Sequence, residues 1–343
     1  MLKVSKSRAA MAALALTMGF VATTASALKI TIGGGGDARD VDLTKSYDFS
    51  ADPASTAATY IVARGTPKNV QKVALVSFCV SLVDGHSVSG SSGPFTASSS
   101  SGFPGQIDSQ RLAGLLDGYR TQFVADLRAA GITVLEPAEL AALPSYQKLA
   151  AKMTTEPYEV SDSYEVGKGT WANNRVQVMS PGGQPMFKDC RALAPGTTMN
   201  LVRAAYQKDL ADVTLLIANV TLDYAKAKAA GGFFRGAKAD LDYGQYIAPG
   251  IESTAFAFIG KGGGTLWLKQ AIVAGQNPFA EGAKGERKTD VKMDNEYKPD
   301  SAYTRTSSQA TTVSSDMDLW YSNAANELKA LSGMLAHALK TSK

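Results

Sequence analysis

The stretch KVALVSFCV, residues 72–80, decides the fold of this chain. After Lys72 its side chains are apolar except for Ser77, and Leu82 and Val83 continue the apolar run. A short continuous apolar run of this kind predicts a strand that is buried on both faces of a sheet. We therefore place residues 72–80 at the centre of a sheet and interpret the flanking sequence outward from them.

A helix and a second strand follow this central strand. Apolar residues recur at helical spacing and predict a helix over 108–130, capped by Asp108 or Ser109: Leu112, Leu115, Leu116, Tyr119, Phe123 and Leu127. Residues 132–135 then predict a short strand, and Pro137 starts a helix over 137–151 that Pro144 can break. Strand, helix, strand and helix in this order predict an α/β layer with a parallel pair, and an α+β arrangement stays possible.

The remaining elements complete a mixed sheet packed by helices. We predict a hairpin insertion around 158–190, a helix over 199–210, a strand over 213–224, and two strands over 254–260 and 265–273 joined at Gly262–Gly264. Ser315 and Asp318 form a possible capping box for the last helix. The expected organisation is a leader over 1–27, a weakly patterned segment over 28–70, an α/β core over 71–275, a polar loop over 276–312 and an amphipathic C-terminal helix over 313–343.

Two long loops, 84–107 and 225–250, are the candidate binding region. Each follows the C-terminal end of a predicted core strand, and ligands of open α/β sheets sit at that edge when the strands are parallel neighbours. We therefore expect one shared surface, which binds an envelope protein or an apolar small molecule, formed by His86, Phe95, Phe103, Phe233, Phe234 and Arg235. The alternative is that these aromatic side chains anchor the loops to the core.

The first 27 residues have the pattern of a secretory signal peptide. Lys3, Lys6 and Arg8 supply the positive charge, Ala9–Val21 the apolar run, and Ala25–Ala27 a small-residue cleavage site. The mature chain is then expected to begin at Leu28 and to lie in the periplasm or on the periplasmic face of the outer membrane. The alternative, an uncleaved membrane anchor, has too short an apolar run.

Composition bounds the class of protein. Apolar residues make up 45% and charged residues 19% of the 343-residue chain, which favours a folded globular protein. The 35 basic and 31 acidic residues leave a nearly neutral mature chain once the three leader cations are removed. We therefore expect no nucleic-acid partner, and no apolar run after residue 28 is long enough to span a membrane.

Histidine and cysteine are too scarce to indicate a metal or a cofactor. His86 and His337 are the only histidines, and Cys79 and Cys190 the only cysteines, so no zinc spacing occurs. An oxidising compartment allows Cys79 and Cys190 to pair, but a buried free Cys79 is an equal alternative. A hydrolase that uses His86 and a loop serine is conceivable, although no G-x-S-x-G elbow exists.

Residues 72–224 also carry a resemblance. The apolar strand at 73–78, the helix that leads into GITVLE at 131–136, and the strand from Ala211 to Asp223 resemble the α/β domain of CsgG-like envelope proteins and the N-terminal domain of TolB. This resemblance implies a role in assembly, secretion or scaffolding rather than catalysis, and it assigns no site residue. Leu28 stands where the lipoprotein members have their anchoring cysteine. We therefore expect a non-enzymatic envelope protein, with a periplasmic small-molecule receptor or a hydrolase as alternatives.

Overall fold

The computed structural model describes residues 30–31, 41–65, 67–92, 95–167, 170–190, 202, 209–232, 236–260, 263–284, 288–292 and 304–341. Its helices are α1 (Pro53–Tyr60), α2 (Ser109–Ala129), α3 (Pro137–Leu140), α4 (Pro144–Ala150), η1 (Pro181–Gly183) and α6 (Met317–Thr341). Its strands are β1 (Ile30–Thr31), β2 (Ile61–Arg64), β3 (Lys72–Ser92), β4 (Phe95–Gly102), β5 (Thr133–Leu135), β6 (Tyr158–Gly167), β7 (Thr170–Met179), β8 (Thr214–Gly232), β9 (Gly236–Ile247), β10 (Ala255–Ile259), β11 (Gly264–Leu268), β12 (Ile272–Val273), β13 (Phe279–Lys284), β14 (Lys288–Lys292) and β15 (Thr304–Ser315).

The strands form one large mixed sheet against which the helices pack, so the predicted α/β class is confirmed. Its main path runs β1-β6-β7-β3-β8-β10-β11-β2, and β3 also pairs in parallel with β5. The predicted buried strand 72–80 is the first half of β3, where Val73, Val76 and Phe78 are fully buried. It lies near the middle of the sheet, where neighbouring strands on both edges and helices over its face shield it from water.

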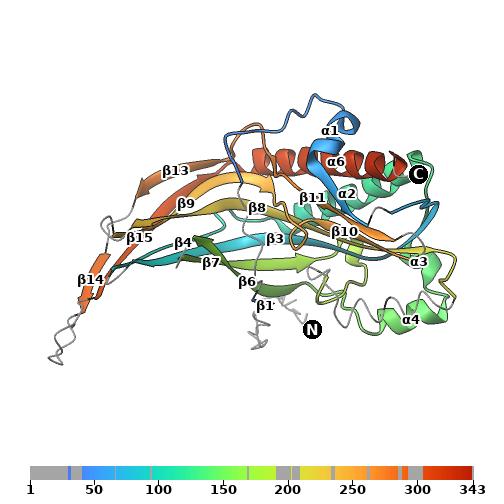
Figure 1. Cartoon of the computed structure of the whole chain (residues 1–343), viewed down its shortest axis with the longest axis horizontal. Helices are drawn as coiled ribbons and strands as arrows, with labels where there is room; N and C mark the ends of the chain where they lie inside the picture. The colour runs from blue at the N-terminus through green and yellow to red at the C-terminus, as the bar shows by residue number, and fades with distance from the viewer. Residues whose placement is uncertain are drawn as a thin grey trace, which may run out of the picture.

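β3 and β8 are parallel neighbours over their first halves and then separate. Val73 pairs with Thr214 and Leu82 with Leu222, so the two strands have the parallel arrangement on which the expected shared surface depended. Beyond this point β3 pairs with β4, and β8 pairs with β9, each as a hairpin. Figure 1 shows these hairpins running with β15 away from the helices to one end of the molecule.

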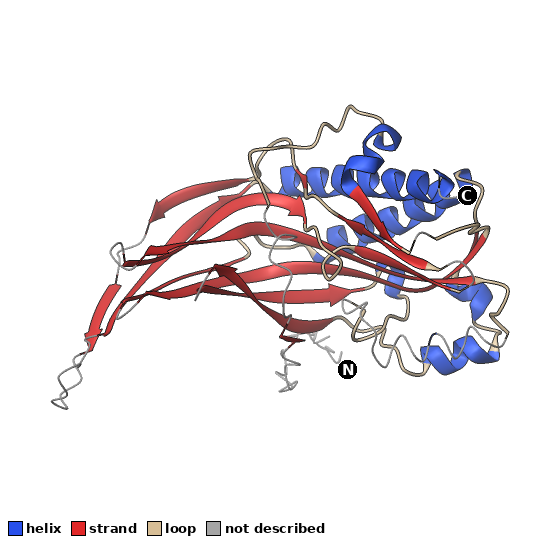
Figure 2. Cartoon of the chain, in the orientation of Figure 1, coloured by secondary structure: helices blue, strands red, loops and turns tan. Residues whose placement is uncertain are grey.

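The helices gather at the opposite end from the hairpins (Figure 2). Asp108 caps α2 as predicted, because its carboxylate accepts from the backbone N–H groups of Gln110 and Arg111. The apolar side of α2 is buried together with α6, whose Trp320, Leu328 and Leu335 are almost fully buried. In Figure 1, α1, α2 and α6 lie above the strands, and α3 and α4 lie below them.

The prediction of two long loops over 84–107 and 225–250 is wrong. Residues 84–102 continue β3 and form β4, and residues 225–247 continue β8 and form β9. The polar loop predicted over 276–312 is also wrong, because β13, β14 and most of β15 lie there. Small or polar residues dominate these strands, so their side chains lack the apolar alternation that identifies a strand. Backbone pairing with neighbouring strands holds them instead.

Smaller differences concern element ends. The segment 28–70 contains α1 and β2, and Pro144 divides the helix predicted over 137–151 into α3 and α4. The strand predicted over 265–273 is β11 and β12, and β12 pairs with β9. Asp316, rather than the Ser315 and Asp318 pair, caps α6, since its carboxylate accepts from the N–H of Leu319 at 3.0 Å. The helix predicted over 199–210 falls almost entirely outside the described residues.

Candidate ligand-binding site

His86 is a buried core residue and not a loop residue. It lies on β3, its side chain is 0% exposed, and its Nε2 lies 2.7 Å from Oδ1 of Asp223 on β8. Its ring stands edge-on to Tyr224 at 4.9 Å between centroids. Nδ1 has no hydrogen-bond partner among the described residues, so no described serine hydroxyl is paired with it. This enclosure does not support the hydrolase alternative, which needs a histidine that a substrate can reach.

The aromatic residues predicted for the same surface do not all fall in the described part of the chain. Phe103 packs edge-on against Tyr224, Phe279 and Trp320, at 5.3, 6.0 and 5.5 Å between ring centroids. It therefore anchors the end of β4 to the core, which was the alternative interpretation. Phe95 begins β4, but its side chain lies outside the described residues, as do Phe233, Phe234 and Arg235.

Cys79 and Cys190 form a disulfide, which the sequence alone left open. Both residues are almost fully buried. The bond ties the centre of β3 to the segment that follows η1, across 111 residues of sequence. The phenol of Tyr158 lies 3.5 Å from the Cys190 sulfur. The disulfide therefore holds the chain that passes beside α3 and α4 against the sheet.

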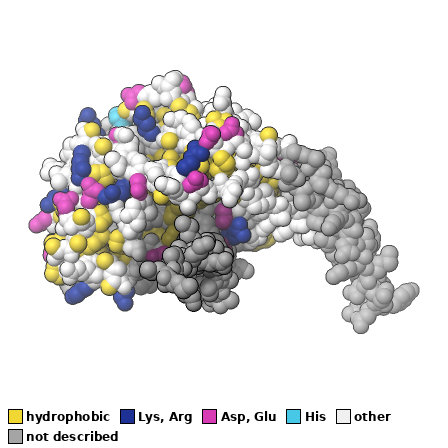
Figure 3. Space-filling model, turned by 180° about the vertical axis from the view of Figure 1, so that it is seen from behind, with side chains coloured by type: hydrophobic (Ala, Val, Ile, Leu, Met, Phe, Trp, Pro, Cys, Tyr) yellow, Lys and Arg dark blue, Asp and Glu magenta, His cyan; other side chains and the backbone are white. Residues whose placement is uncertain are grey.

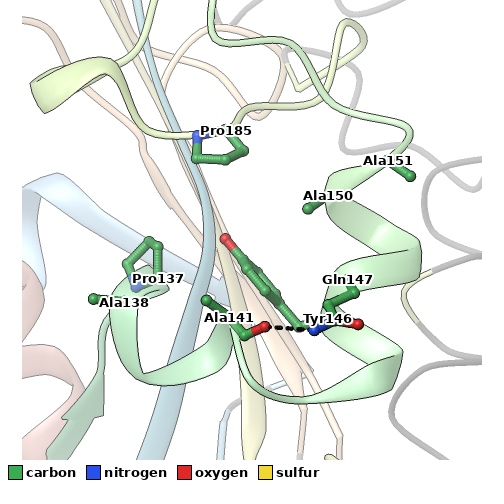
Figure 4. A pocket seen from close by; sticks show the side chains of 8 residues that line it. All are labelled: Pro137, Ala138, Ala141, Tyr146, Gln147, Ala150, Ala151 and Pro185. Carbon is green, nitrogen blue, oxygen red and sulfur yellow. Dashed lines mark hydrogen bonds between the residues drawn. The ribbon is translucent and has the colours of Figure 1, made fainter.

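A cleft of about 540 Å³ opens between α3, α4 and this segment. Its lining is apolar except for Tyr146 and Gln147, and consists of Pro137, Ala138, Ala141, Tyr146, Gln147, Ala150, Ala151 and Pro185 (Figure 4). The small alanine side chains create the space, because a larger residue at any of these positions would extend into it. The volume lies within the range of about 300–1,000 Å³ that is usual for small-molecule sites.

Tyr146 supplies a polar group in the wall of the cleft. The residue is only 3% exposed, and its hydroxyl has no hydrogen-bond partner among the described residues. Figure 4 shows the ring standing between α3 and α4 with the hydroxyl directed toward Pro185. Burial raises the pKa of the Tyr146 phenol above its usual value, so the group stays protonated and can donate. A buried hydroxyl without a partner is costly unless a bound group satisfies it.

The walls of the cleft are held by fixed interactions. Gln147 donates from Nε2 to the carbonyl of Ala141 at 2.9 Å, which joins α4 to the end of α3. Arg120 of α2 pairs with Glu136, which immediately precedes Pro137. Arg128 donates to the same carboxylate at 3.0 Å. These bonds fix both helices, so the cleft exists before any ligand binds.

Sequence reasoning missed this cleft. It placed Leu140, Leu143 and Leu149 on the apolar side of the helix, and Leu140 and Leu149 are indeed buried in the core. The available signal was the opposite side, where alanines recur at 138, 141 and 150 beside a tyrosine. That signal is weak because exposed alanines are common on helices.

Within the described part of the chain, no group of three or more His, Cys, Asp or Glu side chains is placed to hold a metal ion. None of the described helices combines the length and apolar character that crossing a membrane requires. On the face seen in Figure 3, basic and acidic side chains of the described residues are interspersed.

Comparison with protein-family models, with curated proteins and with solved structures finds no match for this chain.

Proposed function

We propose that this chain is an exported, non-enzymatic protein of the bacterial cell envelope, in the periplasm or on the periplasmic face of the outer membrane, and that its cleft binds an apolar ligand. The signal-peptide pattern of residues 1–27 supports export. The resemblance of residues 72–224 to CsgG-like domains supports a role in assembly, secretion or scaffolding.

The observation that carries the proposal is the unsatisfied Tyr146 hydroxyl in the wall of an apolar cleft. An apolar molecule with one hydrogen-bond acceptor would remove the alanine and proline surface of the cleft from water. Its acceptor would also give the Tyr146 hydroxyl the hydrogen bond that it lacks. The preformed walls lower the entropy cost of binding. A side chain of another envelope protein is the alternative occupant, and a periplasmic small-molecule receptor would use the same cleft.

A fluorescence titration with N-phenyl-1-naphthylamine, an apolar probe that brightens out of water, tests the cleft. We expect saturable binding that Ala150→Leu weakens by about tenfold or more, because the larger side chain fills the space. Ala125→Leu makes the same change on the exposed side of α2 and is the matched control. Equal binding by wild type and Ala150→Leu would overturn the proposed site.

Tyr146→Phe separates a binding role from a structural one. Removing a buried hydroxyl that has no partner leaves the thermal stability unchanged or raises it. The same change lowers the affinity for probe molecules that carry a hydrogen-bond acceptor, such as naphthalene ketones, more than it lowers the affinity for naphthalene itself. A clear loss of stability in Tyr146→Phe, with equal binding of both probes, contradicts the assigned role.

A further inference from the structure

A second hollow lies on the sheet, on the outward face of β4, β3, β7 and β6. Backbone pairing aligns three rows of outward residues across these four strands. Gly102, Gly85 and Arg175 lie in the first row, Ser87 and Asn173 in the second, and Trp171 in the third. Successive rows are about 7 Å apart and neighbouring strands about 5 Å apart.

The two glycines of the first row create the hollow. Gly85 and Gly102 are opposite each other, so no side chain stands over this part of the face. A Cβ added at Gly102 would meet nothing within 4 Å, whereas one at Gly85 would touch the side chain of Arg175. The resulting hollow has a volume of about 430 Å³ and is bordered by the Ser87, Ser100, Ser161, Asn173 and Arg175 side chains.

The border offers several fixed polar groups that keep spare hydrogen-bonding capacity. A bulge in β3 between Val83 and Gly85 accompanies the ion pair of Asp84 with Arg175, whose Nε donates to Asp84 at 2.8 Å. Ser163 donates to the Asn173 amide oxygen at 2.7 Å, which orients the amide and leaves its NH₂ group available. The hydroxyls of Ser87, Ser100 and Ser161 make no hydrogen bond to other described residues, and Ser100 and Ser161 are exposed.

The cation at the border of the hollow is already paired. Arg175 is paired with Asp84, and Gln177 links Asp84 to Glu159 on the adjoining strand. An anionic ligand therefore finds no unpaired cation at the border, and a neutral ligand with many hydroxyl groups matches the available donors and acceptors. The hollow therefore lacks the unpaired cation that a phosphate or nucleic-acid site uses.

Trp171 extends the hollow with an aromatic platform. It is 42% exposed and is the one large hydrophobic side chain classed as exposed among the described residues. It lies two residues from Asn173 and four residues from Arg175 on the same face of β7, or about 7 Å and about 14 Å along the strand. The C–H faces of pyranose rings pack on aromatic rings, and an indole presents the largest such surface.

We propose that this face binds a neutral oligosaccharide, with one sugar ring in the glycine hollow and a ring further along the same saccharide on Trp171. Asn173 and Arg175 donate to ring hydroxyls, and the three serines donate to or accept from the same unit. This site and the α3–α4 cleft share no residues and lie on different surfaces. A test of saccharide binding is therefore independent of the proposed function.

Indole N–H signals of protein labelled with ¹⁵N-tryptophan report directly on this site. The chain has three tryptophans, so three indole signals are expected, and Trp171→Phe identifies the one from Trp171. Maltotetraose, cellotetraose, chitotetraose and mannotetraose are titrated separately at millimolar concentration. We expect at least one of them to shift the Trp171 signal saturably, while the signal of the buried Trp320 stays in place.

Gly102→Leu tests the hollow without touching Trp171. Its side chain enters open space, so the fold is retained, and saccharide affinity falls by about tenfold or more because the hollow is filled. Gly114→Leu on exposed α2 also meets open space and is the matched control, with unchanged affinity. The proposal is overturned if none of the four saccharides shifts the Trp171 signal, or if Gly102→Leu binds as tightly as Gly114→Leu.

Discussion

Glu327 is a carboxylic acid enclosed between α6 and β9, and it is completely buried. Its Oε2 accepts from Nε2 of Gln245 at 3.2 Å, and its Oε1 has no partner among the described residues. Burial raises the pKa of Glu327 well above its usual value, and the bond from Gln245 only partly offsets this. The folded protein therefore keeps the proton on Glu327 at pH values where the unfolded chain loses it.

This difference makes stability depend on pH in a defined direction. Above the ordinary glutamate pKa the unfolded chain ionises Glu327 while the folded state does not, so the free energy of unfolding falls as pH rises toward the raised folded pKa. The loss is about 1.4 kcal/mol for each unit by which the pKa is raised. Below the ordinary pKa both states are protonated and the effect vanishes.

Glu327→Gln removes this dependence, because the amide keeps the acceptor for Gln245 and has no proton to lose. We expect the Tm advantage of this variant over wild type to grow from pH 4 to pH 8. Glu139→Gln is the control: this exposed glutamate accepts from the N–H of Glu136, and glutamine can do the same. A Tm difference that stays constant across this pH range contradicts the buried-acid interpretation.

At the scale of elements, α6 is held against α1 at a glycine. A Cβ added at Gly333 would lie 2.9 Å from the Cβ and 3.2 Å from the Cγ of Pro53, and the proline ring cannot move aside. On the other side of α6, Ser332 donates to Asp126 of α2 at 2.6 Å. The absence of a side chain at Gly333 therefore sets how closely the two helices approach.

Gly333→Ala tests this contact between helices. In an open helix position, alanine in place of glycine stabilises by about 0.5–1 kcal/mol. At Gly333 we expect the reverse, a loss of about 1–3 kcal/mol, because the methyl group overlaps Pro53. Gly118→Ala on α2, where a Cβ meets nothing within 4 Å, is the control and stabilises. Urea unfolding measures both, and stabilisation by both substitutions would show that α1 does not limit α6.

At the scale of the whole molecule, the disulfide is a covalent link between distant parts of the chain. It links β3 to a residue 111 positions later, and this interval contains β4, α2, β5, α3, α4, β6 and β7. Cross-linking so long an interval reduces the entropy of the unfolded chain, by about 4–5 kcal/mol in the loop-closure model and about 2–4 kcal/mol in typical measurements. The buried sulfurs also shield the bond from reductants until the protein unfolds.

Intact mass of the protein recovered from a periplasmic extract tests this bond together with export. We expect a chain that begins at Leu28 and is lighter by two hydrogen atoms than its fully reduced form. Iodoacetamide added to the unfolded, unreduced chain should label neither cysteine. Recovery of residues 1–27 overturns the export proposal, and labelling of both cysteines overturns the disulfide. The Cys79→Ala, Cys190→Ala double variant should unfold at a lower urea concentration.

The sequence by itself determined the elements whose side chains follow a clear period. The strand at 72–80, the helix from Ser109 to Ala129 and the C-terminal helix were predicted because apolar side chains there recur at the spacing of the structure they form. The parallel pair expected from the order of strand 72–80, helix 108–130 and strand 132–135 is also present, since β3 pairs in parallel with β5.

Only the tertiary structure decided the long hairpins and both candidate sites. Residues 84–102 and 225–247 are strands because their backbone groups pair with neighbouring strands. Backbone pairing does not require a pattern of side chains, so a Ser- and Gly-rich sequence does not reveal it. The partner of His86 lies 137 residues away, and the cleft joins α3 and α4 to Pro185. Such contacts between distant residues arise only when the sheet brings their strands together, so local patterns cannot reveal them.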